Sequence, residues 1–64
     1  MTIGERIRQY REDAGMTQAD LAEKVGVTHS SISLIENDLR GITVDKLRLI
    51  CDALGVTITD ILEQ

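Results

Sequence analysis

Threonine precedes each of five short segments in which apolar residues recur at helical spacing. These residues are Thr2, Thr17, Thr28, Thr43 and Thr57. A threonine hydroxyl at the start of a helix accepts a hydrogen bond from a backbone amide that the helix itself leaves unpaired. After Thr2, Thr17 and Thr57 a carboxylate follows three positions later and can complete a capping box. Five such starts in 64 residues predict an all-α fold, a compact bundle of five helices.

Glycine marks the ends of three of these segments. Gly15, Gly26 and Gly55 each follow an apolar-periodic stretch, and glycine readily adopts the left-handed conformation that closes many helices. No segment shows the strict polar and apolar alternation of a strand. We therefore predict one domain, residues 1–64, with helices over residues 3–14, 18–25, 29–37, 44–54 and 58–63.

The expected core is aliphatic, because Tyr10 is the only aromatic residue. Helical spacing directs these residues inward: Ile3, Ile7, Tyr10, Ala14, Leu21, Ala22, Val25, Val27, Ile32, Ile35, Val44, Leu47, Ile50, Cys51 and Leu54. As the only cysteine, Cys51 excludes an intrachain disulfide, and we expect a buried core residue rather than a reactive thiol.

The chain offers little for catalysis, metal binding or membrane insertion. Its single histidine and single cysteine fall on different predicted helices, and it has no glycine-rich phosphate loop and no carboxylate pair in an apolar setting. We therefore expect no enzyme activity, no metal, no cofactor and no small-molecule ligand. No apolar run reaches the roughly 20 residues of a bilayer span, and no secretory leader is present, so we expect a cytoplasmic protein.

The net charge of −4 bears directly on any nucleic-acid function. Proteins that bind nucleic acids usually carry a basic surface, because much of their affinity comes from the release of phosphate counterions. An acidic domain therefore binds DNA only if its acids point away from the duplex and a few basic groups and backbone amides meet the phosphates.

Residues 17–36 carry the most informative pattern. Two short predicted helices meet at Gly26, where glycine permits a positive φ, and Ala22 is small enough to let the second helix approach the third. Two helices joined by such a short turn form a helix-turn-helix unit.

The outer side of the predicted helix 29–37 is free of acids. On a helical wheel, Ile32 and Ile35 point inward, and four residues group on the opposite side: His29, Ser30, Ser33 and Leu34. An ordinary solvated face would carry Glu and Lys. Hydroxyls, an imidazole and one leucine suit contact with the edges of base pairs in a major groove.

These patterns resemble the phage-repressor and Cro type of helix-turn-helix domain (XRE-like), which is found also in bacterial regulators and antitoxins. The resemblance is carried by Ile3, Ile7, Arg11, the run Gly15–Ala22, the run Gly26–Thr28, the run Ser31–Asn37 and the run Leu54–Val56. It covers essentially the whole chain. It implies a lambda-repressor-like bundle whose third helix contacts bases.

The resemblance also implies roles for individual residues. It places His29, Ser30, Ser33 and Leu34 at base-contacting positions, and Thr17, Gln18, Thr28, Asn37 and Arg40 at positions that contact the DNA backbone. Gln18 would contact a phosphate or orient a base-contacting side chain. Arg11 and Glu36 match the family's internal ion pair. Plainer alternatives remain open, namely a solvated or capping role for His29 and an isolated exposed apolar position for Leu34.

The joint after the third helix departs from the family pattern. The order is Asp38, Leu39, Arg40, Gly41 and Ile42, where relatives often have glycine and then basic residues. Arg40 remains to meet a phosphate, whereas we expect Asp38 to face the same region. Fewer phosphate contacts predict a shallow salt dependence of binding.

One recognition helix covers only a few base pairs, so we expect a homodimer on a palindromic operator, with half-sites about 34–36 Å apart. The apolar C-terminal residues either finish the core or form the dimer interface, which we favour: Val56, Ile58, Ile61 and Leu62. The predicted function is transcriptional regulation, most simply repression. The alternative is a protein-interaction module, antitoxin-like or anti-regulator-like, that keeps the fold without binding DNA.

Overall fold

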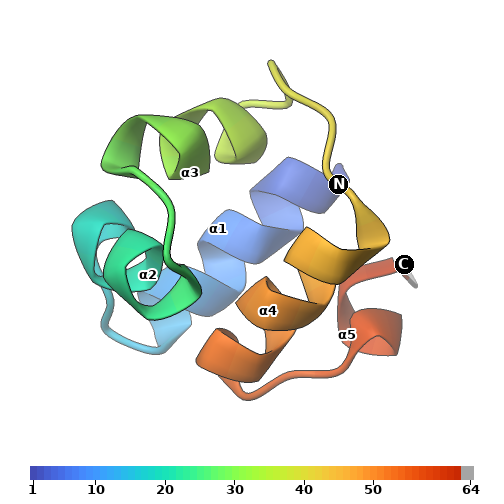
Figure 1. Ribbon diagram of the computed structural model, residues 1–64. Coiled ribbons are helices and arrows are strands. Elements are labelled where there is room, and N and C mark those ends of the chain that lie inside the picture. The colour runs from blue at the N-terminus through green and yellow to red at the C-terminus, as the bar shows by residue number, and fades with distance from the viewer. Residues whose placement is uncertain (63–64) are drawn as a thin grey trace.

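Five α-helices follow one another in the computed structural model, which describes residues 1–62. They are α1 (Ile3–Asp13), α2 (Gln18–Val25), α3 (His29–Glu36), α4 (Val44–Leu54) and α5 (Ile58–Leu62) (Figure 1). The predicted all-α bundle is confirmed. Helices α1 and α3 each end one residue earlier than predicted, and residue 63 of the last predicted helix lies outside the described residues.

The threonine caps form as the sequence predicts. Thr2 and Thr17 complete capping boxes with Glu5 and Asp20, in which each threonine hydroxyl accepts from the third amide of its helix. The hydroxyls of Thr28 and Thr43 accept from the amides of Ser31 and Lys46. Thr57 exchanges the same pair of hydrogen bonds with Asp60. The three predicted glycines, Gly15, Gly26 and Gly55, all have positive φ.

One hydrophobic core joins the helices. Its buried members are Ile7, Leu21, Ala22, Val25, Ile32, Ile35, Leu47, Ile50, Cys51 and Ile61. Tyr10, Val27, Leu54, Val56 and Ile58 are partly buried against it. Burial raises the pKa of the Cys51 thiol, which agrees with the predicted core role of this residue.

Three predicted core residues lie outside the core. Ile3 is 39% exposed, Val44 is 62% exposed and Ala14 is exposed. Ile3 and Val44 are the first residues of α1 and α4, and Ala14 is the C-cap of α1. A helical wheel assigns these positions to the inner face, but end turns project past the neighbouring helices that would cover them.

The end of α5 corrects part of the predicted dimer interface. Ile61 is only 1% exposed, so its side chain is already buried within the chain and is not available to a partner. Its neighbour Leu62 is 49% exposed. Successive residues of a helix point about 100° apart, so burying one leaves the next outside.

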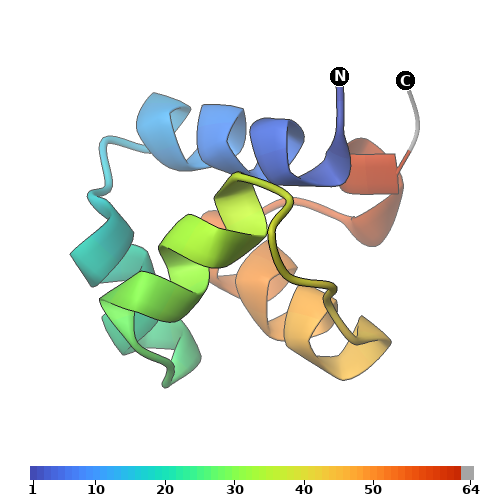
Figure 2. The same ribbon diagram turned by 90° about the horizontal axis from the view of Figure 1, so that it is seen from above.

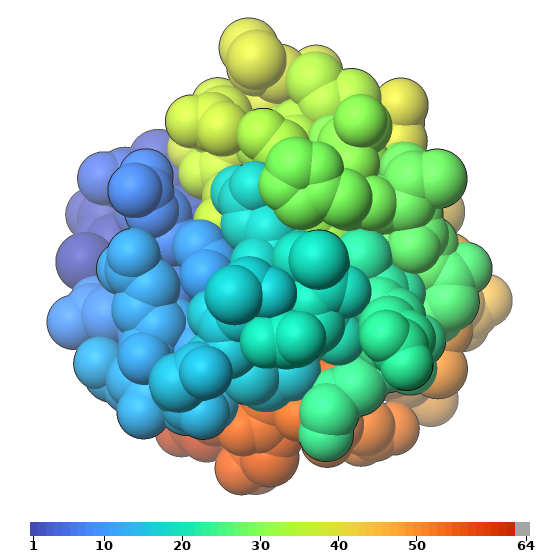
Figure 3. Space-filling view, turned by 90° about the vertical axis from the view of Figure 1, so that its left-hand side faces the viewer, coloured from blue at the N-terminus to red at the C-terminus, as the bar shows by residue number. Residues whose placement is uncertain are grey.

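Helices α2 and α3 pack side by side (Figure 3), while α3 also packs against α1. The packing against α1 depends on Gly4, which is buried. A Cβ atom at Gly4 would lie 2.7 Å from both Glu36 O and Asp38 Oδ1, and closer still to Ile35 O. The missing side chain therefore allows the first turn of α1 to touch the last turn of α3.

Within residues 1–62, no helix is long and apolar enough to cross a membrane.

Candidate nucleic-acid interface

The outer side of α3 forms an open surface. Figure 2 looks down on α3, and no other described segment crosses the helix from this side. Of the four predicted base-contacting residues, His29 and Ser30 are exposed, whereas Ser33 and Leu34 are half-buried. The first turn of α3 contains no acid, and its only carboxylate, that of Glu36, is buried. The predicted absence of acid from this surface is confirmed.

A buried ion pair holds the C-terminal end of α3 against α1. Arg11 Nε lies 2.7 Å from Glu36 Oε2, and Arg11 Nη2 donates to Glu36 Oε1 at 3.0 Å. Arg11 Nη1 also donates to the carbonyl of Met16 at 2.7 Å. The hydrogen bonds that Arg11 donates to the Glu36 carboxylate raise the pKa of Arg11 above its ordinary value. A buried pair of this kind fixes geometry more reliably than it adds stability.

Gln18 joins this pair from the first turn of α2. Its side-chain amide donates to Glu36 Oε1 at 3.1 Å, and the side chain is half-buried. We expected Gln18 to contact a phosphate or to orient a base-contacting side chain; its contact in the structure is with the buried Glu36 of the ion pair, and neither expected role is tested by it. Thr17, beside it, is exposed, and its hydroxyl and amide serve the capping box of α2. The start of α2 is thereby fixed along one flank of α3.

The opposite flank of α3 is formed by the segment between α3 and α4. Arg40 reaches back across nine residues, and its Nη1 donates to Ser31 Oγ at 2.8 Å. The Thr28 hydroxyl also donates to Ser31 Oγ, at 3.0 Å. These bonds bring the exposed Arg40 guanidinium to the first turn of α3.

A hollow of about 300 Å³ adjoins this flank. Its lining includes the cationic side chains of Arg40 and Lys46 together with Ser31 and Thr43, and it contains no acid. Sequence reasoning missed Lys46. No local pattern marks it, because Lys46 lies in the first turn of α4 and reaches this lining only through the packing of α4 beside the joint.

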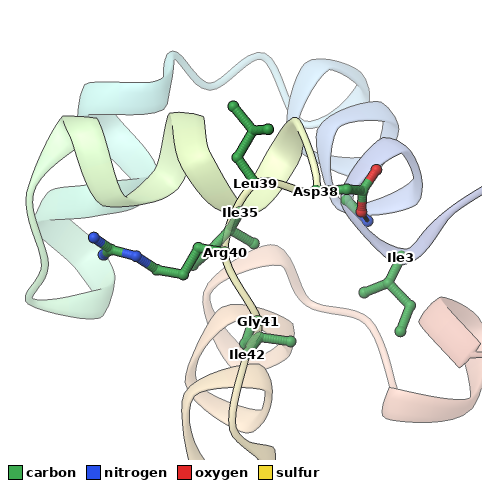
Figure 4. Close-up of a pocket in the computed structure, with 8 residues that line it drawn as sticks. Ile3, Ile35, Asp38, Leu39, Arg40, Gly41 and Ile42 are labelled. Carbon is green, nitrogen blue, oxygen red and sulfur yellow. Dashed lines mark hydrogen bonds between the residues drawn. The ribbon is translucent and has the colours of Figure 1, made fainter.

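Asn37 and Asp38 follow α3, and their side chains contact different parts of the molecule. Asn37 is exposed, and its side-chain amide donates to the carbonyl of Ser33 at 2.8 Å. We expected Asp38 to face the DNA-binding region beside Arg40. Instead its carboxylate accepts hydrogen bonds from Thr2 Oγ1 at 2.6 Å and from Gly4 N at 3.2 Å, at the start of α1. Figure 4 shows the Asp38 and Arg40 side chains extending in opposite directions from the chain.

The described residues contain no group of three or more histidine, cysteine or carboxylate side chains placed to hold a metal ion.

The known proteins that this chain resembles include repressors and other regulators. The chain is 34% identical over 64 residues to the immunity repressor protein of Bacillus phage phi105, which covers all of this chain and 44% of that repressor. It matches the structure of the biofilm regulator SinR in complex with DNA with a TM-score of 0.91 and 36% identity, covering 97% of this chain and 100% of that one. The P22 c2 repressor, in complex with a synthetic operator, matches with a TM-score of 0.90 and 30% identity, covering 98% of this chain and 96% of that one.

The family comparison agrees with these matches. The helix-turn-helix family model matches residues 7–61. That range includes α2, the turn at Gly26 and all of α3. This protein therefore belongs to the helix-turn-helix family.

Proposed function

We propose that this chain binds double-stranded DNA sequence-specifically, with α3 in the major groove, and thereby regulates transcription. The observation that carries the proposal is the open, acid-free outer side of α3 in a protein whose net charge is −4. An α-helix fits the major groove of B-DNA, where each base pair presents its own pattern of donors, acceptors and methyl groups. His29 and Ser30 offer polar groups there, and Leu34 offers an apolar contact to a thymine methyl.

Both flanks of α3 support contact with phosphates. Arg40 and Lys46 supply positive charge on one side, where no acid lines the hollow. On the other side, Thr17 and Gln18 at the start of α2 face the second phosphate strand, beside the Asp20 carboxylate that caps this helix. Thr28 and Asn37 complete the proposed backbone contacts at the two ends of α3. With so few cations, log K should fall by only about 2 to 4 for each tenfold increase in salt.

The relatives support a regulator. They are an immunity repressor, a regulator whose structure was solved in complex with DNA and a repressor in complex with an operator. The chain spans less than half of the phage repressor's length, so any sensing activity of such a longer protein does not transfer to these residues. We propose repression by occupancy of an operator, with no catalytic step.

Dimerisation would supply the specificity that one recognition helix lacks. We propose that Val56, Ile58 and Leu62 contribute to a homodimer interface, without Ile61, because Leu62 is exposed and the other two are only partly buried. Two copies would then present their α3 helices to successive major grooves on one side of a palindromic operator.

Selection of bound duplexes from a random pool tests this function. We expect enrichment of a two-fold symmetric site, and binding that weakens as salt rises. Leu34→Ala should relax preference at one thymine-containing position and leave non-specific binding almost unchanged, whereas Arg40→Ala should weaken binding to all sequences alike.

A protein-interaction module is the second candidate, favoured by Leu39, which is 74% exposed beside a hollow of about 460 Å³. Such a module would select no sequence and would bind no duplex at low salt, so the same selection separates the two functions.

A further inference from the structure

The carboxylate of Asp38 connects two segments that are far apart in the sequence. It accepts a hydrogen bond from the Thr2 hydroxyl at 2.6 Å and another from the Gly4 amide at 3.2 Å. Thr2 is the N-cap of α1, and Gly4 lies in the first turn of that helix. Asp38 therefore satisfies one of the amides that α1 leaves unpaired, and its negative charge lies at the positive end of the α1 dipole.

The backbone at Asp38 is shaped for this contact. Asp38 is the only non-glycine residue with positive φ among residues 1–62, at 58°. Aspartate and asparagine tolerate this left-handed conformation better than most residues. The reversal directs the carboxylate toward α1, while the chain continues through Leu39 to Arg40 on the other side (Figure 4). Gly4 leaves no room for a side chain at the same junction, so the contact is tightly packed.

Two anchors therefore fix the segment after α3. Asp38 attaches its start to α1, and Arg40 attaches its middle to Ser31 on α3. The only acid of residues 37–42 is withdrawn from the outer side of α3, while the only cation of this segment is held beside it.

We propose that Asp38 is a positioning residue for DNA binding: by attaching the joint after α3 to the start of α1, it holds Arg40 in place to meet a phosphate. This inference rests on the proposed function. It leads to an outcome opposite to that of simple electrostatics, because removing an acid from an acidic DNA-binding domain would otherwise strengthen binding.

The test compares two substitutions at this position. Asp38→Gly retains the positive φ without strain and removes both hydrogen bonds. Asp38→Asn removes the same charge but keeps a side-chain oxygen that can accept from Gly4 N, and asparagine also tolerates positive φ. Asp52→Asn, at an exposed position near the C-terminal end of α4, controls for the change in net charge alone.

Fluorescence anisotropy with the selected duplex, at several salt concentrations, gives the readout. We expect Asp38→Gly to weaken binding at least about threefold and to reduce the salt dependence by about one phosphate contact, which is also the change in salt dependence that we expect of Arg40→Ala. We expect Asp38→Asn to bind as tightly as Asp52→Asn, because both variants remove one negative charge and keep the anchor. Equal or tighter binding by Asp38→Gly would overturn the proposal, and so would identical affinities of the two Asp38 variants.

Amide hydrogen exchange of the protein without DNA tests this inference independently of the proposed function. If Asp38 anchors the joint, the Gly4 amide should exchange faster in Asp38→Gly than in Asp38→Asn, whether or not DNA binds. Unchanged exchange would show that the anchor is absent. If the unmodified protein bound no duplex at all, the proposed function would fail instead.

Discussion

Replacing Gly4 by alanine tests the packing of α1 against the end of α3. The new Cβ atom would lie 2.7 Å from Glu36 O and from Asp38 Oδ1, and closer to Ile35 O. Two of these three atoms belong to the backbone, so rotating a side chain does not relieve the overlap. The two helices must separate by roughly 1 Å, because unstrained carbon and oxygen atoms pack at about 3.5 Å.

The expected loss of stability follows from two opposing terms. Overpacking of this kind destabilises by about 1–3 kcal/mol. Alanine gains at most about 1 kcal/mol over glycine from helix propensity, and less than that in a first turn. After subtraction of this gain, we expect Gly4→Ala to lower the unfolding free energy by about 0.5–2.5 kcal/mol, which corresponds to a fall in Tm of about 2 to 20 °C for a domain of this size.

Thermal and urea unfolding followed by circular dichroism measure this change. Gly41→Ala is the matched control, because a Cβ there meets no atom within 4 Å and the residue does not have positive φ. That variant should stay within about 0.5 kcal/mol of the unmodified protein. If Gly4→Ala were as stable as Gly41→Ala, the close approach of α1 and α3 would be refuted.

Further predictions concern the ion pair, a cap and the core. Glu36→Gln leaves the Arg11 charge buried without its partner and should lower the unfolding free energy by about 3–5 kcal/mol in urea titrations; an effect under 1 kcal/mol would contradict the buried pair. Hydrogen bonds from Thr17 lower the pKa of Asp20, so this carboxylate stabilises the fold above its unfolded pKa and ceases to do so as pH falls through the lower folded value. Tm should therefore drop below about pH 4, less steeply in Asp20→Asn; parallel pH profiles would refute the cap. Ile50→Ala should lower the unfolding free energy by about 2–5 kcal/mol, because it leaves a cavity in the core, whereas Val44→Ala should change it by no more than about 0.5 kcal/mol. Equal losses of stability in the two variants would place Val44 in the core.

Local features of the sequence predicted the helices well. Each cap depends on residues three positions apart, such as Thr17 and Asp20, and each glycine stop depends on one φ angle. These interactions form within a single turn, so the sequence pattern contains all of their geometry. The inward positions in the middle of helices, such as Ile50, follow from the helical repeat for the same reason.

Contacts between helices were harder to predict from the sequence. The Arg11–Glu36 pair was anticipated only through the family resemblance, since 25 residues separate the partners. The exposure of Ile3 and Val44 depends on where the neighbouring helices end, which a wheel does not represent.

In the candidate site, too, features within one helix were predicted and contacts between helices were not. The acid-free side of α3 follows from the order of residues in one helix. The direction of the Asp38 side chain does not, because it depends on a positive φ and on an amide 34 residues away in α1. Lys46 was likewise missed, because only the packing of α4 beside the joint brings it near Arg40.

Mapping of amide chemical shifts by NMR during titration with the selected duplex tests the central claim most directly. If α3 enters the major groove, the largest changes will occur at its outer side, at His29, Ser30, Ser33 and Leu34, with smaller changes at Thr17 and Arg40. Changes confined to α5, or spectra that do not respond to any duplex at low ionic strength, would contradict the assignment of α3 as the recognition helix.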